Sequence, residues 1–325
     1  MRYLGRRIVF YAITAWAAVT INFLIPRLMP GNPVQILVAR FQGRLSPSAT
    51  ASLTALFGLN NASLWSQYVK FWSEMLHGNL GISFTYFPVP VTQVIRQSLP
   101  WTVALIGIST IIAFALGTFL GVIVGWRRGT WTDSLLPVTT FFSSVPYFWF
   151  ALVAVFVLGA RLHWFPVTGG YSTSLSMGFT GAFIGSAIYH GLLPALTIVV
   201  ASLGGWLLGM RNMMITTMST DYVAMAEAKG LHRRRVVFAY AARNAVLPSI
   251  AGFAMSLGFV VSGAILVEIV FSYPGIGYQL YNAVTNEDYP LMQGIFLIIA
   301  LAVLAANFLA DLAYVLLDPR TRQDS

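Results

Sequence analysis

The sequence DYVAMAEAKGLHRRRVVFAYAARNAVLP, at residues 221–248, is the one long polar stretch with a membrane-length apolar segment on each side. Its charged side chains are five basic and two acidic: Lys229, Arg233, Arg234, Arg235, Arg243, Asp221 and Glu227. A basic, helix-forming stretch of this length between two membrane spans predicts a surface on which a cytoplasmic partner docks. The rest of the chain is then expected to be the membrane device that this surface drives.

The composition excludes most soluble classes of protein. Charged residues make up 9% of the 325 residues, where soluble domains carry about 25%. The formal charge of +9 forms no basic stripe with interleaved aromatic residues, so we expect no nucleic-acid partner. The absence of cysteine excludes disulfides and thiolate metal sites, and the four histidines lack ligand spacing, so no metal site is expected. The chain is therefore predicted to be an all-α integral membrane protein.

Six stretches approach the roughly 20 apolar residues that a helix needs to cross a bilayer. They are residues 8–28, 100–125, 135–159, 192–210, 249–270 and 291–317. If the N-terminus is cytoplasmic, the cytoplasmic parts hold thirteen of the 19 Lys and Arg residues, which satisfies the positive-inside rule. Arg2, Arg6 and Arg7 precede a first apolar run without a small-residue cleavage site, which predicts an uncleaved anchor. Both termini are then expected in the cytoplasm.

The segment 29–99 is predicted to be a small helical insert on the outer face. Ser46-Pro47 and Gly58 have the residue types that begin and end a helix. Ser63 is predicted to begin a second helix, which Gly78 ends. The apolar residues expected to share one face of that second helix are Leu64, Tyr68, Phe71, Trp72 and Met75. The loops 160–191 and 271–290 are also predicted to lie outside.

Within residues 221–248, small residues lie close together at Ala224, Ala226, Ala228 and Gly230. Gly230 is expected to break the first short helix, and residues 231–244 to form a second one. Two short helices at an angle form a knob that can enter a cleft in a partner protein. The alternative is an amphipathic helix that lies on anionic lipid, and the residues alone leave both open.

These residues resemble the EAA loop of the permease subunits of ATP-binding-cassette (ABC) importers, and the spacing to Leu247-Pro248 is similar to the peptide/nickel-type group. The resemblance implies that the loop docks on an ATPase subunit. The coupling residues that it implies are Asp221, Ala224, Ala226, Glu227, Gly230, Leu231, Arg243, Asn244, Leu247 and Pro248. Ala224 stands where the family has Glu, so no salt bridge is expected from that position.

The resemblance extends over the whole chain. The further motifs are Met1 to Leu4 with Arg6-Arg7, Pro30 to Pro33, Gly78 to Gly81 with Ser83-Phe84, Glu268 with Phe271, Pro274, Gly275 and Gly277, Asp288 to Pro290, and Asp311, Tyr314 and Leu317 to Arg320. Two family aspartates appear as Asn32 and Asn79, which keep the local turn hydrogen bond. The insert after the first span is typical of the B-type permease.

The resemblance implies a type I importer permease with six spans, driven by ATP through alternating access. Its implied partners are a paralogous C-type permease, two cytoplasmic ATP-binding subunits, an extracytoplasmic solute-binding protein and membrane lipid. The chain has no P-loop, no Gly-x-Ser-x-Gly and no His-Glu-x-x-His, so we expect no enzyme activity and no cofactor in it. ATP and magnesium are expected in the ATPase subunits.

Polar residues inside predicted spans are functional candidates by default. Glu268, Asn307 and Asp311 are interpreted as hydrogen-bonded structural groups between helices, and a proton relay, which would make the chain a proton-coupled secondary transporter, is the alternative. Gly117, Gly121 and Gly125 predict close helix packing. The methionines Met210, Met213, Met214, Met218 and Met225 are interpreted as packing residues, with a solute path as the alternative.

The predicted organisation is a first span at 1–28, the insert at 29–99, a permease core at 100–317 with the coupling loop 211–248, and a cytoplasmic tail at 318–325. The expected substrate is a di- or oligopeptide. A cellobiose-like oligosaccharide is the alternative, because aromatic residues suited to sugar stacking occur in the outer parts: Trp101, Trp149, Trp164, Tyr171 and Tyr189. Nickel is a third, weaker alternative. The expected location is a bacterial or archaeal inner membrane.

Overall fold

The computed structural model describes residues 2–28, 63–258, 260 and 265–317, and these form helices and connecting loops. The helices are α1 (Arg2–Leu28), α4 (Leu64–Leu76), α5 (Val91–Trp126), α6 (Leu135–Ser144), α7 (Tyr147–Ala154), α8 (Gly181–Met218), α9 (Asp221–Ala228), α10 (Arg233–Arg235), α11 (Arg243–Gly258), α12 (Ile265–Val270), α13 (Ile276–Thr285) and α14 (Tyr289–Leu317). A 3₁₀ turn covers Trp131–Ser134, and π-helical segments cover Val155–Arg161 and Val236–Ala242. The described residues contain no strand beyond an isolated bridge between Ile82 and Pro90.

Five helical stretches are long and apolar enough to cross a membrane: Gly5–Ile25, Val91–Trp126, Gly181–Met218, Arg233–Leu257 and Tyr289–Phe308. The third predicted span, residues 135–159, is broken, because the helices on either side of Val145 and Pro146 are bent by 92°. Pro146 lacks a backbone N–H and holds the preceding residue out of the helical region, and Val145 has an extended ψ of 132°. The all-α membrane class is confirmed, with five to six spans.

Two helices are longer than their apolar cores predict. α5 begins at Val91, inside the segment expected to belong to the insert, and continues through Pro100. α8 begins at Gly181, inside a segment expected to be a loop, where the Thr180 hydroxyl caps it by accepting from the Phe183 N–H. The fifth predicted span is α11 followed by α12, and most of the connection between them lies outside the described residues.

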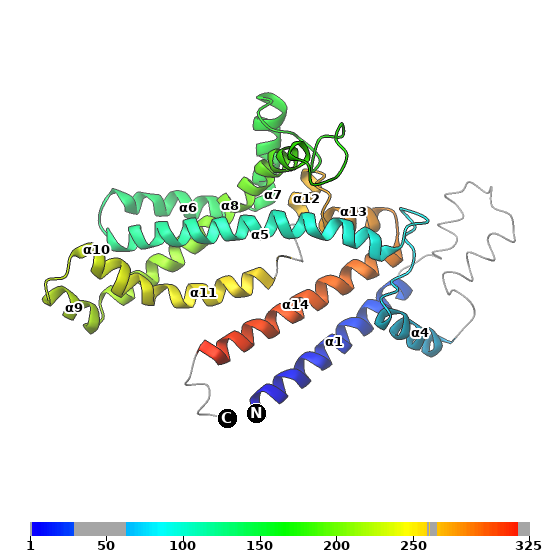
Figure 1. Cartoon of the computed structure of the whole chain (residues 1–325), viewed down its shortest axis with the longest axis horizontal. Coiled ribbons are helices and arrows are strands. Elements are labelled where there is room, and N and C mark those ends of the chain that lie inside the picture. Colours follow the sequence, from blue (N-terminus) through cyan, green and yellow to red (C-terminus); the bar gives the residue numbers. More distant parts are fainter. Residues whose placement is uncertain (1, 29–62, 259, 261–264, 318–325) are drawn as a thin grey trace.

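Figure 1 shows two ends of the molecule, one with α9 and α10 and the opposite one with α4 and α13. We call them the α9 end and the α13 end. α5 runs between them from Val91 at the α13 end to Trp126 at the α9 end (Figure 1). The segment with α9 and α10 and the segments with α4 and α13 therefore lie at opposite ends of the molecule.

The second predicted helix of the insert is confirmed as α4. Ser63 caps it by accepting from the Ser66 N–H at 3.3 Å, and Gly78 follows it with φ +75°. Tyr68 packs on Phe23 of α1 with ring centroids 5.1 Å apart, and its hydroxyl lies 2.7 Å from that of Thr20. Leu64 differs from the prediction, because it is exposed. The first predicted helix of the insert, at 46–58, lies outside the described residues.

α1 packs along α14 through polar pairs. The Asn22 side-chain amide donates to the Gln293 carbonyl at 2.9 Å, and the Gln293 amide donates to the Asn22 carbonyl at 3.0 Å. Toward the other end of the same helix pair, Arg7 of α1 contacts Asp311 of α14 at 2.5 Å. Such hydrogen bonds between side chains and backbone help to fix the register of the two helices.

α5 and α8 pack closely, and the glycine repeat in α5 makes this contact possible. A Cβ at Gly117 would lie 2.6 Å from Trp206 Cβ, one at Gly121 2.6 Å from the Leu207 carbonyl oxygen, and one at Gly125 2.6 Å from Met214 Cβ. Real Cβ atoms do not approach so closely, so the two helices touch only because these positions lack side chains. The predicted packing role of the repeat is confirmed.

Replacing Gly121 by valine is therefore expected to destabilise the protein. The new side chain meets backbone of α8, which cannot rotate away, and overpacking of this kind costs about 1–3 kcal/mol. Thermal unfolding of the purified assembly should show a lower Tm than wild type. Gly209→Ala on α8 is the matched control, because a Cβ there meets nothing within 4 Å. Equal Tm values for Gly121→Val and wild type would contradict this account of the helix contact.

Candidate functional site

The stretch 221–248 forms a helix, a tight turn and a second, longer helix. α9 ends where Gly230 adopts φ +70°, a left-handed conformation that glycine adopts without steric cost. The Gly230 N–H donates to the Glu227 carbonyl at 2.9 Å and the Leu231 N–H to the Ala226 carbonyl at 3.4 Å, which closes the helix end. The second helix begins at Arg233 and runs without a break into the membrane span. The predicted helix break at Gly230 is confirmed.

One face of α9 is buried against the chain itself. Val223 and Ala226 are 1% and 2% exposed. They join an apolar cluster, the inner cluster, whose buried members are Val122, Met210, Met214, Val223, Ala226, Val236, Val237, Ala241 and Ala245. This cluster holds α9 against the ends of α5 and α8.

The opposite face of α9 is open. Asp221, Tyr222, Ala224, Met225 and Glu227 are exposed, with Met225 at 61%. The two alanines of the motif therefore have different surroundings: Ala224 is exposed, whereas Ala226 packs within this chain. Tyr222 and Met225 are large exposed side chains that the motif did not single out. A helical wheel anchored on Val223 and Ala226 would have found them, because residues three apart share a face.

The remaining coupling residues follow on the turn and the second helix. Leu231 is half-buried beside the inner cluster. Arg243 and Asn244 are exposed, and the Asn244 amide donates to the Tyr240 carbonyl at 2.9 Å. Leu247, at 60% exposure, and Pro248 lie one turn further along α11. The motif's two parts therefore lie on α9 and along α11, joined by the Gly230 turn.

The indole of Trp126 links the end of α5 to the start of the second helix. The guanidinium carbon of Arg127 lies 5.7 Å from the Trp126 ring centroid and that of Arg233 lies 5.6 Å from it. Phe238 meets the same ring edge-on at 6.4 Å. Cation–π contacts of this length hold two arginines at the α9 end without any carboxylate.

At the α13 end, Glu268 is fully buried and its carboxylate accepts three hydrogen bonds. The donors are the Thr102 hydroxyl at 2.7 Å and the N–H groups of Gly277 and Tyr278 at 2.6 and 3.3 Å. The two N–H groups are in the first turn of α13, where a helix has unpaired donors and a partial positive charge. Thr102 also accepts from the Ile276 N–H at 2.7 Å, so α5, α12 and α13 meet at one carboxylate.

The glycines of the same motif make room for this carboxylate. A Cβ at Gly275 would overlap the Glu268 carboxyl group, and one at Gly277 would lie 2.7 Å from Ile265 Cα. Close by, the hydroxyl of Tyr273 is buried, and burial raises the pKa of Tyr273 above its ordinary value. The motif residues 268–277 therefore form one helix-capping structure, and this geometry favours a structural role for Glu268 over a proton relay.

A second buried carboxylate, Asp288, caps α14. Its Oδ1 accepts from the Leu291 N–H at 3.1 Å, and its Oδ2 accepts from the Ser83 hydroxyl and the Thr85 N–H at 2.5 and 2.8 Å. Nearby, burial raises the pKa of Tyr86, and the protonated phenol donates to Gln279 Oε1 at 2.7 Å. Two motifs far apart in sequence, around Ser83 and around Asp288, are thus one structure.

Asp311 lies inside α14 and pairs with α1. It accepts from Arg7 at 2.5 Å and from the Tyr11 hydroxyl at 2.6 Å, which places a neutralised carboxylate between two helices. Asn307, one turn earlier on α14, is half-buried. Neither Asp311 nor Asn307 lies near Glu268 in sequence or shares a hydrogen bond with it among the described residues, so the three groups form no continuous relay.

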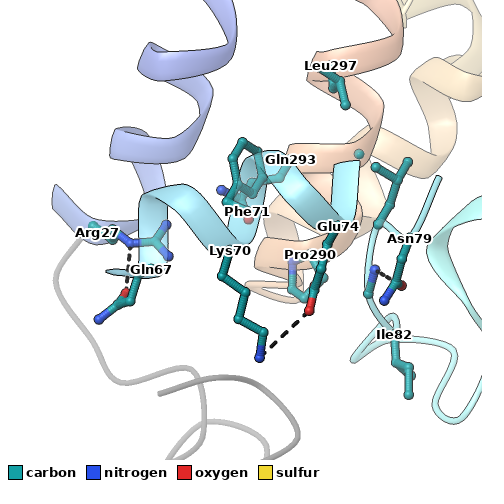
Figure 2. A pocket seen from close by; sticks show the side chains of 13 residues that line it. Arg27, Gln67, Lys70, Phe71, Glu74, Asn79, Ile82, Pro290, Gln293 and Leu297 are labelled. Atoms are coloured by element: carbon teal, nitrogen blue, oxygen red, sulfur yellow. Dashed lines mark hydrogen bonds and ion pairs between the residues drawn. The ribbon is translucent and has the colours of Figure 1, made fainter. Parts of the chain in front are cut away.

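A cavity of about 390 Å³ opens at the α13 end between α1, α4, the segment 79–82 and α14 (Figure 2). Its polar lining residues are Arg27, Gln67, Lys70, Glu74, Asn79 and Gln293. Its apolar lining residues include Phe71 of α4 and Leu297 of α14. No motif pointed to it, because its residues come from four separate segments.

Two of the five aromatic residues that were expected to suit sugar stacking, Trp101 and Tyr171, stack on each other, whereas Trp149 and Trp164 are exposed. Trp101 stacks on Tyr171 with ring centroids 5.8 Å apart and an interplanar angle of 12°, and Tyr273 meets Trp101 edge-on at 5.6 Å. The Tyr189 hydroxyl donates to the Trp164 carbonyl at 2.6 Å. The Trp101 face that would stack on a sugar ring is thus occupied by Tyr171.

Five to six spans, with a tight turn between two helices at one end, define a multi-pass helical membrane protein. Residues 117–323 match the family of binding-protein-dependent transport system inner membrane components, and the chain belongs to that family. The fold is accordingly that of an ABC type I permease, a multi-pass inner membrane protein that works with ATPase, binding-protein and other permease components. It is not itself the catalytic subunit.

Curated relatives match over nearly the full length of the chain. The chain is 32% identical to the oligopeptide transport system permease protein AppB of Bacillus subtilis, over 92% of each chain. It is 32% identical to the di/tripeptide transport system permease protein DppB of Pseudomonas aeruginosa, over 99% of each, and 30% identical to the dipeptide transport system permease protein DppB of Escherichia coli, also over 99% of each.

Proposed function

We propose that this chain is the B-type permease of an ATP-driven peptide importer and that α9 with the Gly230 turn is its coupling element. The observation that carries the proposal is the two-faced α9. One face is buried in the inner cluster on α5 and α8, and the other presents Tyr222, Ala224 and Met225 to a partner. A coupling element needs both faces, because it must be packed against the spans of its own chain and must also bind the partner subunit.

The proposed topology puts the α9 end and both termini in the cytoplasm. At this end lie Arg127, Arg128, Lys229 and Arg233 to Arg235, whereas the α13 end has Arg27, Lys70 and Arg96. The positive-inside rule counts the first group, which is in short loops. The insert with α4 then faces the extracytoplasmic side, where a solute-binding protein delivers its cargo.

The proposed assembly contains a paralogous C-type permease and two cytoplasmic ATP-binding subunits, which bind ATP and magnesium. Alternating access follows if the ATPases bind the exposed face of α9 differently in their open and closed states. Only such a difference in binding free energy can shift the population of inward-facing and outward-facing states.

The proposed substrate is a di- or oligopeptide, because the relatives that match over the whole chain are named as peptide permeases. A cellobiose-like sugar is disfavoured by the mutual stacking of Trp101 and Tyr171. Glu268 and Asp311 have internal partners, which disfavours a proton-coupled transporter.

Uptake by the complete transporter in proteoliposomes should therefore depend on internal ATP and on the binding protein. We expect labelled di- and tripeptides to enter and unlabelled peptides to compete, with cellobiose and Ni²⁺ having no effect at the same concentration. Uptake that cellobiose abolishes and peptides leave unchanged would contradict the peptide proposal but leave the permease assignment in place.

A further inference from the structure

The cavity at the α13 end has an excess of positive charge. Two cations, Arg27 and Lys70, and one carboxylate, Glu74, line it. Lys70 lies 3.7 Å from Glu74, a loose pair of exposed side chains at the rim (Figure 2). Within the described residues the partners of Arg27 are neutral: Gln67 Oε1 at 3.2 Å, the Phe23 carbonyl at 2.7 Å and the Phe23 ring at 3.6 Å. These partners leave guanidinium N–H donors for an anion.

The lining of the cavity changes from charged to apolar along α14. Its cations come from the end of α1 and from α4, whereas Phe71, Pro290 and Leu297 provide an apolar wall that continues along α14. Figure 2 shows Leu297 further along α14 than Pro290, away from the Lys70 and Glu74 side chains of α4. A ligand with an anionic head and an apolar tail matches this order of side chains.

The position of the cavity relative to the spans selects the kind of ligand. The apolar span of α1 ends at Ile25, two residues before Arg27, and that of α14 begins at Tyr289, next to the lining residue Pro290. The cavity therefore lies at the depth of lipid headgroups. Ile21 and Leu24, in the last turns of the α1 span before Arg27, are exposed apolar residues, as contact with the acyl chains of a lipid requires.

We propose that this cavity binds the headgroup of a phospholipid in the leaflet at the α13 end, with its phosphodiester between Arg27 and Lys70. Arg27 supplies charge-assisted hydrogen bonds, which are stronger than neutral ones. Glu74 faces the group attached to the phosphate, so an ethanolamine ammonium or a glycerol hydroxyl fits there. A bound lipid of this kind would tie α4 to α1 and α14.

Native mass spectrometry of the complete transporter, without ATP or peptide, tests the proposal. After delipidation, the probes are phosphatidylglycerol, phosphatidylethanolamine and glycerol 3-phosphate, added one at a time. We expect wild type to retain a phospholipid and Arg27→Gln with Lys70→Gln to lower its affinity by about tenfold or more, because two charged donors are lost. Arg161→Gln is the matched control, since Arg161 also lies over a phenylalanine ring, Phe156, at 5.4 Å.

Equal lipid retention in wild type and the double variant would overturn the proposal, as would an equal loss in Arg161→Gln. Binding of glycerol 3-phosphate as tight as that of the lipids would assign the cavity to a soluble phosphate ester and also overturn it. Because retention is measured without transport, this result stands or falls independently of the peptide-import proposal.

Discussion

Replacing Gly230 by arginine is expected to abolish transport and substrate-stimulated ATP hydrolysis while the subunit still inserts into the membrane. Gly230 has φ +70°, which costs a residue with a Cβ about 1–2 kcal/mol. That cost is local, because a Cβ there meets nothing within 4 Å. The larger effect comes from a long cationic side chain at the tip of the proposed coupling element, next to Lys229. The measurement is ATPase activity of the reconstituted transporter with and without loaded binding protein.

The chain offers a closely matched control in Gly129→Arg. Gly129 also has a left-handed φ, +79°, with nothing within 4 Å of its Cβ position, and it follows α5 at the α9 end. Arginine at Gly129 therefore adds the same charge and strain outside α9 and its turn. Full coupling in Gly230→Arg, or equal loss in both variants, would remove the docking proposal. Ala224→Arg should reproduce the loss, since Ala224 is on the exposed face of α9.

Much of the architecture could be predicted from the sequence, because the length and the apolar content of a span can be counted from its own residues alone. The break in the third predicted span could not, since a hydropathy criterion averages over residues 135–159 and does not register the change of direction at Val145-Pro146. Local hydropathy places the first turns of α5 in the insert, because Gln93 and Arg96 occur there among apolar residues. These turns are nevertheless helical, because they continue the helix of the adjoining span, and adding turns to an existing helix does not require them to be apolar.

In the candidate site, too, the features set by local sequence could be predicted, whereas those set by contacts distant in sequence could not. Glycine adopts a left-handed conformation without steric cost, so the residue type at position 230 is sufficient to predict the helix break. Which alanine faces inward depends on contacts of α9 with Met210 and Met214, which no local pattern contains. The partner of Glu268 is Thr102, 166 residues away, and that of Asp288 is Ser83, 205 residues away. Segments far apart in the sequence are thus joined in the structure by shared hydrogen-bond networks.

Both networks are at the α13 end, which gives that end a rigid construction. Glu268 joins α5, α12 and α13, and Asp288 joins α14 to the segment that leads into α5. The inner cluster holds the α9 end by apolar contacts, which tolerate small displacements better than buried charged hydrogen bonds do. A push on α9 is then expected to turn α5 as a unit, with the α13 end moving as one body.

Replacing Glu268 by alanine is accordingly expected to produce the largest loss of stability in the membrane core. The Thr102 hydroxyl and the N–H groups of Gly277 and Tyr278 would lose their acceptor inside the protein. Breaking a buried charged network from one side costs about 3–5 kcal/mol. The expected result is a strongly lowered Tm and loss of uptake. Glu287→Ala, at the exposed glutamate of the same end, should leave both unchanged.

The amide variant Glu268→Gln separates a structural role from a proton relay. Its oxygen can accept from the two N–H groups, and its NH₂ can donate to the Thr102 hydroxyl, which has a second lone pair. We therefore expect a smaller loss of Tm than in Glu268→Ala, and uptake whose dependence on external pH has the same shape as in wild type. A relay would require the carboxyl proton, so wild-type uptake that varies with pH and a flat profile in Glu268→Gln would reverse the assignment. The hydrogen bonds of Glu268 satisfy all three neighbouring donors without any proton transfer, which is why the flat profile is not expected.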